Sequence, residues 1–328
     1  MSDKVPMGMP LEELLERATL LGSGSYGAVF APWDYPHLVV KVFGLSASVE
    51  EEAKAYRQAR RLLGADCKIF PQLVAVNRRD KALLLQRAPG LTLTDFLECL
   101  SGVLPHRLLD TDEVDQLFSV AKALLAAVSQ LSAAGLVHRD LKPENIMLDL
   151  GEDGEPKITL IDIGLLVESG QGDPGRNYST WWRSPHAEEN TATEVEDCHA
   201  AVWSVILGLL PLGFKREFCA YDGRKQVKIM TRAWSPQDRE AHQQYYNGRF
   251  PDGRDFDEAY PEAPEGTWTM SAEPYLLSKM EECPAKKGLA EMFRLALRPM
   301  QSAEMLSAME AAAKPPGRKT YLEVLMGR

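Results

Sequence analysis

The chain is short of cysteine, and the few cysteines that it has are scattered. Its 328 residues include five, and none of them forms a CxxC pair. Isolated cysteines in an odd number favour reduced thiols in an intracellular compartment over a disulfide framework or a zinc site. The amino-terminal residues also lack the apolar core of a signal sequence. We therefore expect an intracellular protein, either cytoplasmic or nuclear.

Positive charge and long apolar runs are also scarce. The chain has 37 Lys and Arg against 47 Asp and Glu, a net charge of −10. This surplus argues against general binding to nucleic acid or to an anionic membrane, although it leaves room for a local basic patch. The longest apolar run, residues 200–214, is too short to span a bilayer and contains Pro211. We expect a buried helix there, and neither a nucleic-acid nor a membrane partner.

Residues 15–88 are predicted to form a small, strand-rich part after an extension at residues 1–14. Strand patterns occupy residues 19–31, around a glycine-rich turn, and residues 37–43, 70–76 and 82–85. Residues 48–63 change to helical periodicity, and Ser48 with Glu51 fits a capping box. The sequence Ala-Pro-Gly at 88–90 then interrupts the chain, as a hinge between two parts would.

Residues 89–312 are predicted to be mainly helical, with a tail at 313–328. Apolar residues follow helical spacing from 114 to 131, and Gly135 is a suitable end for that helix. Residues 146–148 and 157–161 have the pattern of two short strands. Residues 211–287 are irregular and too long for an ordinary connection, which indicates either an insertion with a function of its own or embedded short helices. Helical spacing returns from 288 to 312.

The motif HRDLKPEN, residues 138–145, carries the strongest chemical signal. Within six residues it combines a proton acceptor, Asp140, a cation that can reach a phosphate, Lys142, and an amide that can ligate a metal, Asn145. Phosphoryl transfer to a hydroxyl needs these three chemistries side by side. A buried polar turn is the simpler alternative, since such residues suit turns. A chance match of eight letters is improbable, so we favour the chemical interpretation.

Two further patterns occur upstream. Gly22, Gly24 and Gly27 form a GxGxxG motif with strand-like sequence on both sides. A dinucleotide site places this motif between a strand and a helix, so a hairpin flap over phosphates is the better fit. Lys41 lies inside an apolar strand, where it either extends to solvent from the strand edge or pairs with an anion. Glu52 is the predicted partner, because Tyr56, one helical turn further on, would then face the interior.

A third pattern lies downstream, where the apolar stretch at 158–161 ends in Asp162-Ile163-Gly164. Such an Asp-x-Gly is compatible with an ordinary turn. A carboxylate one hairpin away from Asn145 also suits Mg²⁺, which prefers one or two carboxylates together with substrate phosphates. We favour the metal site.

Taken together, these motifs resemble those of the eukaryotic-type protein kinases, in order and spacing, over about residues 15–312. The resemblance implies an α+β fold of two lobes, a small β-rich lobe with one main helix and a larger helical lobe, with ATP and Mg²⁺ between them. The implied catalytic residues are Asp140, Lys142, Lys41 and Glu52, and the implied metal ligands are Asn145 and Asp162. The implied nucleotide-binding residues are Leu21, Gly22, Gly24, Gly27, Val29, Val39, Lys41, Leu85, Gln86, Ala88 and Met147.

The resemblance has consequences elsewhere in the chain. An interior stack is implied for Tyr56, Leu73, His138 and Ile163, and Asp197 is the expected anchoring aspartate of the following helix. The sequence departs from the family pattern at Ile163, where phenylalanine is usual, at Val39, where alanine is usual, and at His186, where glutamate is usual. Without that glutamate, either Arg298 pairs with Glu188 or Glu189 or this lobe is looser than is usual in the family.

The expected substrates are proteins with Ser or Thr acceptors. Lys142 resembles the serine/threonine kinases, and residues 181–185 resemble the group of cyclin-dependent and mitogen-activated kinases. Arg139 precedes the expected base and would bind the phosphate of a phosphorylated Tyr178 or Thr180. Ser179 would have a structural role. An activating kinase or another regulatory partner would control this step. Two alternatives stay open: a pseudokinase that binds nucleotide or partners without turnover, and a small-molecule kinase of the aminoglycoside or choline type.

Overall fold

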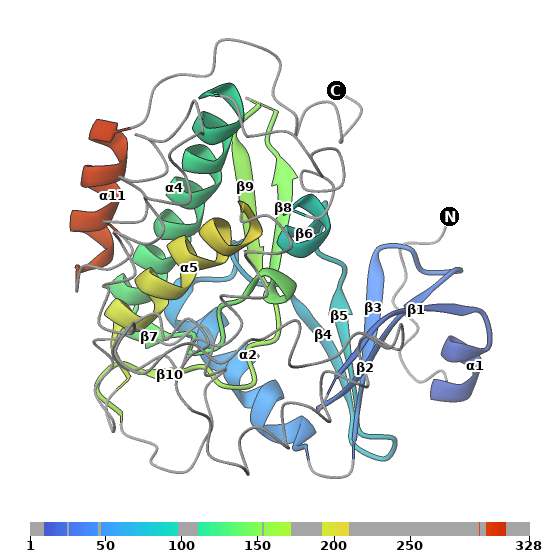
Figure 1. The fold of residues 1–328 in the computed structure, drawn as a ribbon. Helices are drawn as coiled ribbons and strands as arrows, with labels where there is room; N and C mark the ends of the chain where they lie inside the picture. Colours follow the sequence, from blue (N-terminus) through green and yellow to red (C-terminus); the bar gives the residue numbers. More distant parts are fainter. Residues whose placement is uncertain are drawn as a thin grey trace, which may run out of the picture.

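A computed structural model describes residues 10–24, 26–44, 47–97, 111–152, 154–171, 192–209, 295 and 300–312. These residues form a β-rich part and a mainly helical part that lie side by side (Figure 1). This is the predicted α+β arrangement. The predicted boundaries between the parts stay predictions, and residues 211–287 lie outside the described residues.

The β-rich part is an antiparallel sheet with the order β1-β2-β3-β5-β4. Its strands are β1 Ala18–Gly24, β2 Gly27–Pro32, β3 Leu38–Phe43, β4 Leu73–Asn77 and β5 Ala82–Gln86. The predicted strand at 70–76 starts later than expected. Pro71 has no N–H for a ladder hydrogen bond, so pairing begins only at Leu73.

The two faces of this sheet bury different partners. On one face, α1 (Leu11–Glu16) covers a small cluster that includes Leu38, Val40 and Leu84, with Leu11 and Leu15 packed against it. On the other face lies α2 (Val49–Leu63), which begins as predicted because the Ser48 hydroxyl accepts a hydrogen bond from the Glu51 N–H, at 3.3 Å. The amphipathic pattern of α2 therefore sets which of its residues face the sheet.

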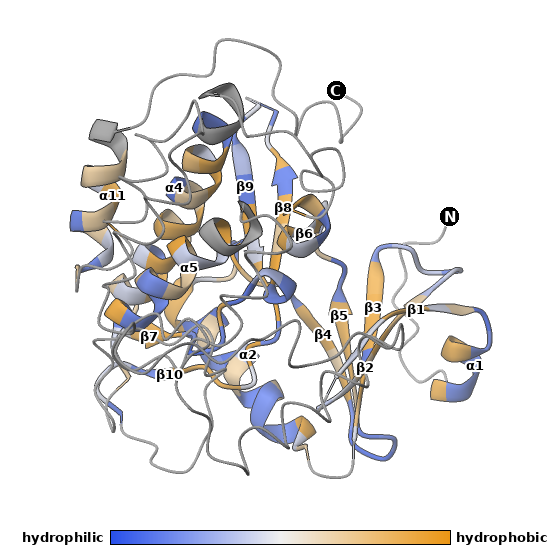
Figure 2. Ribbon diagram, viewed as in Figure 1, coloured by the Kyte–Doolittle hydropathy of each residue, from blue (hydrophilic) through white to orange (hydrophobic). Residues whose placement is uncertain are grey.

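The helical part is built around α4 (Thr111–Ala133), which packs against α5 (Glu194–Leu209) and α11 (Ser302–Ala312). Figure 2 shows the apolar residues of α4 gathered where it meets its neighbours, and Leu117, Leu124 and Leu131 are completely buried. By length and composition α4 is the one described helix that could cross a membrane, but 56% of its most apolar window is buried inside the fold. A core helix has these same properties.

Two sequence predictions about helices need adjustment. The buried helix expected at 200–214 starts earlier, at Glu194, and is buried as expected from Ala200 to Val205. Helical structure expected throughout 288–312 is interrupted, because Met300 and Gln301 lie outside any helix and α11 begins at Ser302. The sequence has a proline at position 299, a residue type that cannot donate to the helix ladder.

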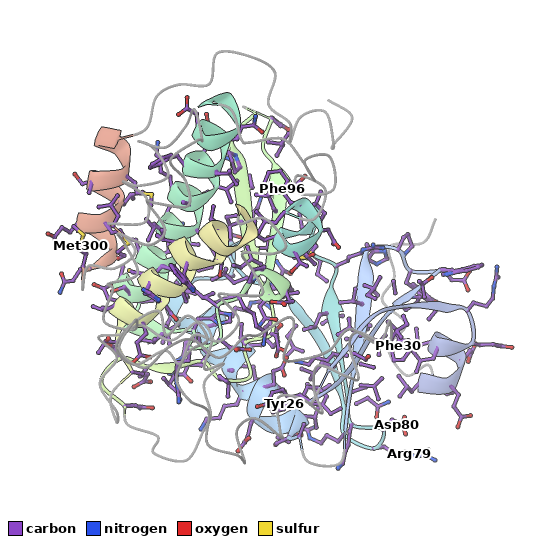
Figure 3. All side chains as sticks on the ribbon, viewed as in Figure 1. Tyr26, Phe30, Arg79, Asp80, Phe96 and Met300 are labelled. Atoms are coloured by element: carbon purple, nitrogen blue, oxygen red, sulfur yellow. The ribbon has the colours of Figure 1, made fainter. Side chains whose placement is uncertain are left out.

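Short strands pack beside α4 in the helical part. β6 (Leu91–Thr92), β8 (Ile146–Leu150) and β9 (Pro156–Leu160) form a three-stranded sheet, while β7 (Leu136–Val137) pairs with β10 (Val167–Glu168). The HRDLKPEN segment lies between β7 and β8 and contains a 3-10 turn, Pro143–Asn145. Figure 3 shows Tyr26 beside the sheet and Phe96, a buried core residue, in the helical part.

Candidate active site

Lys41 lies at the centre of the site. It belongs to β3, where β2 pairs on one side and β5 on the other, so its backbone is held in the middle of the sheet. Its Nζ lies 2.9 and 2.7 Å from the two carboxylate oxygens of Glu52 and 2.7 Å from Oδ1 of Asp162. The predicted Lys41–Glu52 pair is therefore present, and Lys41 also joins the β-rich part to the segment after β9.

The charges of this cluster alter one another's ionisation. Burial alone would lower the pKa of Lys41, but the carboxylates of Glu52 and Asp162 raise it above its usual value, so the ammonium stays charged. Burial raises the pKa of Glu52 to about 7, against the opposing attraction of Lys41. Burial would also raise the pKa of Asp162, yet the charge and hydrogen bond of Lys41 lower it below its usual range. Asp162 is thus the more firmly ionised carboxylate.

A second cluster forms around Asp140. The Lys142 Nζ lies 2.8 Å from Oδ2 of Asp140. The Asn145 Nδ2 donates to the same oxygen and to the backbone oxygen of Asp140, both at 2.9 Å. The 3-10 turn at Pro143–Asn145 brings the amide back over the aspartate. Both of these hydrogen bonds use Nδ2, which leaves Oδ1 as the amide atom that a cation could reach.

Asp197 of α5 binds the backbone of the HRDLKPEN loop. Its carboxylate accepts hydrogen bonds from the backbone N–H groups of His138, at 2.6 Å, and Arg139, at 2.9 Å. Burial raises the pKa of Asp197 to about 6, although the two N–H groups act in the opposite direction. Arg139 has a φ of 71°, a left-handed conformation that is costly for this residue type. The expected anchoring aspartate thus holds a strained loop in place.

Asp162 and Asn145 lie at the ends of neighbouring strands. β8 pairs with β9, and the Ile161 N–H donates to the Asn145 backbone oxygen at 2.9 Å. Asp162 has a φ of 59°, and a Cβ at Gly164 would come within 3.3 Å of Oε2 of Glu52. Among the described residues no three His, Cys, Asp or Glu side chains cluster as a metal site. One carboxylate and one amide oxygen still fit Mg²⁺, which completes its coordination with water and phosphate.

The glycine motif forms the predicted hairpin. Gly22 and Gly24 lie in β1, and Gly27 begins β2. A Cβ at Gly27 would lie 2.0 Å from the Val42 backbone oxygen, while Cβ atoms at Gly22 and Gly24 would meet nothing within 4 Å. The three glycines therefore differ: Gly27 permits close approach of two strands, and the other two leave an open backbone edge.

The remaining predicted nucleotide-binding residues are spread over both parts. Val39 pairs with Leu85 across β3 and β5, Val29 pairs with Lys41 across β2 and β3, and Leu21 is exposed in β1. Met147 lies on β8 of the other part. Gln86 ends β5, and its N–H donates to Gln72, whereas no described backbone group accepts from the Ala88 N–H. The edge of an adenine ring would need a donor of this kind.

The four residues predicted to form an interior stack lie in or against the core, and their mutual stacking stays a prediction. Tyr56 and Ile163 are buried in the main core, and Leu73 packs against it. His138 is completely buried, and this burial lowers its pKa to about 4, so the ring is neutral at physiological pH. The sequence interpretation missed Phe70, whose ring centroid lies 6.2 Å from that of His138. The sequence offered one signal for Phe70, an aromatic residue directly before Pro71, but residues 70–76 were predicted to form a strand.

A second missed contact joins α2 to β10, where the Gln58 Nε2 donates to the Glu168 carboxylate at 2.8 Å. Other predicted residues lie outside the described residues. These are Tyr178, Ser179, Thr180, His186, Glu188, Glu189 and Arg298.

Comparison with known proteins decides the family. The family model "Protein kinase domain" matches residues 15–253, well over half of the chain. This chain belongs to the protein kinase family. The kinase domain is 33% identical over 130 residues to a probable cell division protein kinase of Encephalitozoon cuniculi, an alignment that covers 38% of this chain and 39% of that protein.

The kinase domain is also distantly homologous to mitogen-activated protein kinases. It is 26% identical over 230 residues to mitogen-activated protein kinase 14 of Xenopus laevis, with 66% of this chain and 59% of that protein covered. It is 28% identical over 189 residues to mitogen-activated protein kinase 12 of Mus musculus, with 56% and 49% covered. The chain thus spans between 39% and 59% of the length of these three relatives.

Proposed function

We propose that this kinase domain transfers the γ-phosphate of ATP to Ser or Thr hydroxyls of protein substrates, in a reaction that depends on Mg²⁺. The observation that carries the proposal is the position of the Lys41 Nζ, which contacts Glu52 and Asp162 at 2.7–2.9 Å. A lysine that bridges the β-rich part to a metal-ligating carboxylate is placed to hold phosphates where the two parts meet.

Nucleotide binding is assigned to the β-rich part and β8. The open backbone edge at Gly22 and Gly24 would cover the phosphates, and Lys41 would neutralise them. The apolar side chains of Leu21, Val29, Val39, Leu85 and Met147 would enclose the adenine, with the backbone of Gln86 and Ala88 at its polar edge. Asp162 and Asn145 would hold Mg²⁺, which supplies neutralisation of charge on the phosphate oxygens.

The transfer step is assigned to the Asp140 cluster. The acceptor hydroxyl oxygen forms a bond to the γ-phosphorus while the bond from that phosphorus to the bridging oxygen breaks, and ADP leaves. Asp140 orients the hydroxyl and takes its proton. Lys142, 2.8 Å from Asp140, neutralises negative charge on the phosphoryl group as it moves. The Asn145 bonds to Asp140 hold this carboxylate in one orientation.

Substrate class and location belong to the same proposal. Lys142 in the loop and the distant homology to mitogen-activated protein kinases support Ser/Thr acceptors over Tyr. The scattered cysteines support an intracellular location. An activating kinase or another regulatory partner would phosphorylate Tyr178 or Thr180, and Arg139 would bind the resulting phosphate.

Transfer of radiolabelled phosphate from ATP to a library of Ser, Thr and Tyr peptides tests the proposal. We expect labelling of Ser/Thr peptides that disappears in Asp140→Asn and in Lys41→Met, while Asp66→Asn and Lys54→Met, at exposed positions, stay active. ATP binding with no transfer by the unmodified protein would support a pseudokinase instead. Labelling of small alcohols with a blank peptide library would support a small-molecule kinase.

A further inference from the structure

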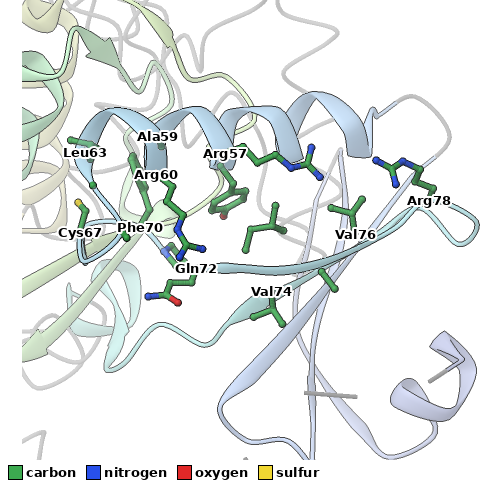
Figure 4. Close-up of a pocket in the computed structure, with 16 residues that line it drawn as sticks. Arg57, Ala59, Arg60, Leu63, Cys67, Phe70, Gln72, Val74, Val76 and Arg78 are labelled. Carbon is green, nitrogen blue, oxygen red and sulfur yellow. The ribbon is translucent and has the colours of Figure 1, made fainter. Parts of the chain in front are cut away.

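The exposed side of α2 collects positive charge. It carries Lys54, Arg57, Arg60 and Arg61, and all four side chains are exposed. Figure 4 shows the side chains of Arg57 and Arg60 extending from this helix. No carboxylate of the described residues forms an ion pair with any of the four. We call these four residues the basic patch.

The spacing of the basic patch works against the stability of the helix. Residues three or four positions apart are neighbours on a helix surface, and like charges there are destabilising. Arg57 is followed at these distances by Arg60 and Arg61, Lys54 precedes it by three positions, and residues 53–65 contain no Asp or Glu. The helix dipole accounts for the two cations of the last turn but not for the two earlier ones. A local cost without a compensating contact indicates a function.

An exposed leucine follows the basic patch directly. Leu62 has an exposed fraction of 41%, which is high for a large apolar side chain. The other end of α2 differs, because Glu50 and Glu51 lie in its first turn and Glu50 pairs with Arg78. Cations beside an exposed apolar side chain suit the surface of an anionic bilayer, where the cations attract headgroups and the apolar group enters the interface.

We propose that the basic patch and Leu62 bind the surface of an anionic membrane. The net charge of −10 led us to expect no membrane partner, but it left room for a local basic patch. Local charge decides the contact, because screening limits the attraction to about 8 Å at physiological salt. The apolar side of α2 stays packed in the core, with Ala53 and Tyr56 buried. The helix therefore lies on the membrane surface and does not insert.

A bilayer fits this surface better than nucleic acid does. Proteins that bind single strands without sequence preference stack the bases on aromatic side chains. None of the exposed residues of α2 is aromatic, since its one aromatic residue, Tyr56, is buried. Leu62 would gain nothing from a phosphate backbone, whereas the interface of a bilayer takes up apolar side chains. The patch and the leucine are thus explained together only by a lipid surface.

Co-sedimentation of the protein with lipid vesicles tests the proposal. The probes are vesicles of phosphatidylcholine alone and vesicles that also contain phosphatidylserine. We expect binding to the second kind only, half-maximal at about 1 mM lipid for four cations and weaker in added salt. Arg57→Glu should weaken it by about tenfold or more. Arg79→Glu, the same charge change at an exposed position between β4 and β5, should stay within about twofold, and Leu62→Ser should weaken it by about threefold.

A stability measurement separates loss of binding from loss of folding. Arg57→Glu replaces repulsion of Arg60 and Arg61 by attraction, and a glutamate four positions before an arginine is the favourable order on a helix. This variant should therefore unfold at the same urea concentration as the unmodified protein or at a higher one. A lower concentration would contradict the cost that we infer for the basic patch.

Several results would overturn the proposal. Absence of binding to phosphatidylserine vesicles up to about 10 mM lipid would exclude the membrane contact. Equal weakening by Arg57→Glu and Arg79→Glu would show attraction by overall charge. Unchanged binding in Leu62→Ser would show that no apolar contact is made, and tighter binding of an oligothymidylate, lost in Arg57→Glu, would assign the patch to nucleic acid. Vesicle binding needs no phosphate transfer, so its outcome is independent of the proposed function.

Discussion

Lys41 on β3 donates hydrogen bonds to both carboxylate oxygens of Glu52 on α2, at 2.9 and 2.7 Å. These are charge-assisted bonds between buried groups, with side chains that are 8% and 4% exposed. Because breaking a buried ion pair leaves an uncompensated charge, the contact strongly couples the helix to the sheet. The position of α2 therefore decides whether Lys41 is held ready for a phosphate.

The first prediction concerns Glu52 and pH. With its pKa raised to about 7 by burial, Glu52 loses its charge as the pH falls through that value, and its attraction for Lys41 falls with it. We expect kcat/KM to decrease on the acid side with an apparent pKa near 7. Glu52→Gln should be slower by about tenfold or more at alkaline pH and should lack this acid limb. The exposed neighbour Glu51→Gln should keep it; the same limb in Glu52→Gln would assign the titration to another group.

The second prediction separates the three glycines. Gly27→Ala places a methyl group 2.0 Å from the Val42 oxygen, at a φ of +148°, so we expect a loss of about 2 kcal/mol or more in the free energy of unfolding. Gly22→Ala and Gly24→Ala meet open space and should change it by less than about 0.5 kcal/mol, while weakening ATP binding. Urea unfolding and calorimetric titration with ATP measure the two effects. Equal stability of all three variants would contradict the strand contact at Gly27.

The third prediction concerns the Asp197 anchor. In Asp197→Asn only one side-chain oxygen remains, and the amide NH₂ would face a backbone N–H of His138 or Arg139. A buried donor without an acceptor costs about 1–3 kcal/mol, so the variant should unfold at a lower urea concentration. Transfer should also slow, because the loop that carries Asp140 loses a support. Asp66→Asn, at an exposed position, is the control, and equal stability of the two variants would remove Asp197 from this role.

The fourth prediction concerns His138. In the fold its pKa is lowered to about 4, from 6.5, because it is buried. Below pH 6.5 the unfolded chain takes up a proton that the folded chain refuses, so this histidine contributes stability above pH 6.5 that is lost as the pH falls toward 4. The loss amounts to about 3 kcal/mol. In His138→Gln the difference in stability between pH 7 and pH 4.5 should shrink by that order, as measured by urea unfolding. An unchanged difference would show that His138 is not the group responsible.

Much of the local structure follows from short-range pattern. A stretch rich in β-branched residues predicted β3, and helical spacing with Ser48 as cap predicted α2. The late start of β4 has a local cause as well, because Pro71 cannot donate to the ladder. Strand and helix preferences depend on neighbours two to four residues away, so they can be recognised in the chain itself. The motif at 138–145 could be recognised for the same reason.

Contacts between residues that are far apart in the sequence do not follow from such short-range patterns. The Lys41–Asp162 ion pair joins residues 121 positions apart, and Asp197 reaches the backbone of His138 across 59. The resemblance gave Asp162 and Asp197 roles but predicted neither of these two contacts, and Phe70 and Gln58 had no comparable signal.

The amino-acid order thus specified the strands, the capped helix and the chemically reactive loop, because each depends on residues that are close along the chain. Packing alone decided which carboxylates share Lys41, which aspartate supports the loop, and that Phe70 lies beside His138. These features arise only when α2, β3 and α5 come together with the loops between them, since burial, desolvation and the pairing of charges are properties of surfaces in contact.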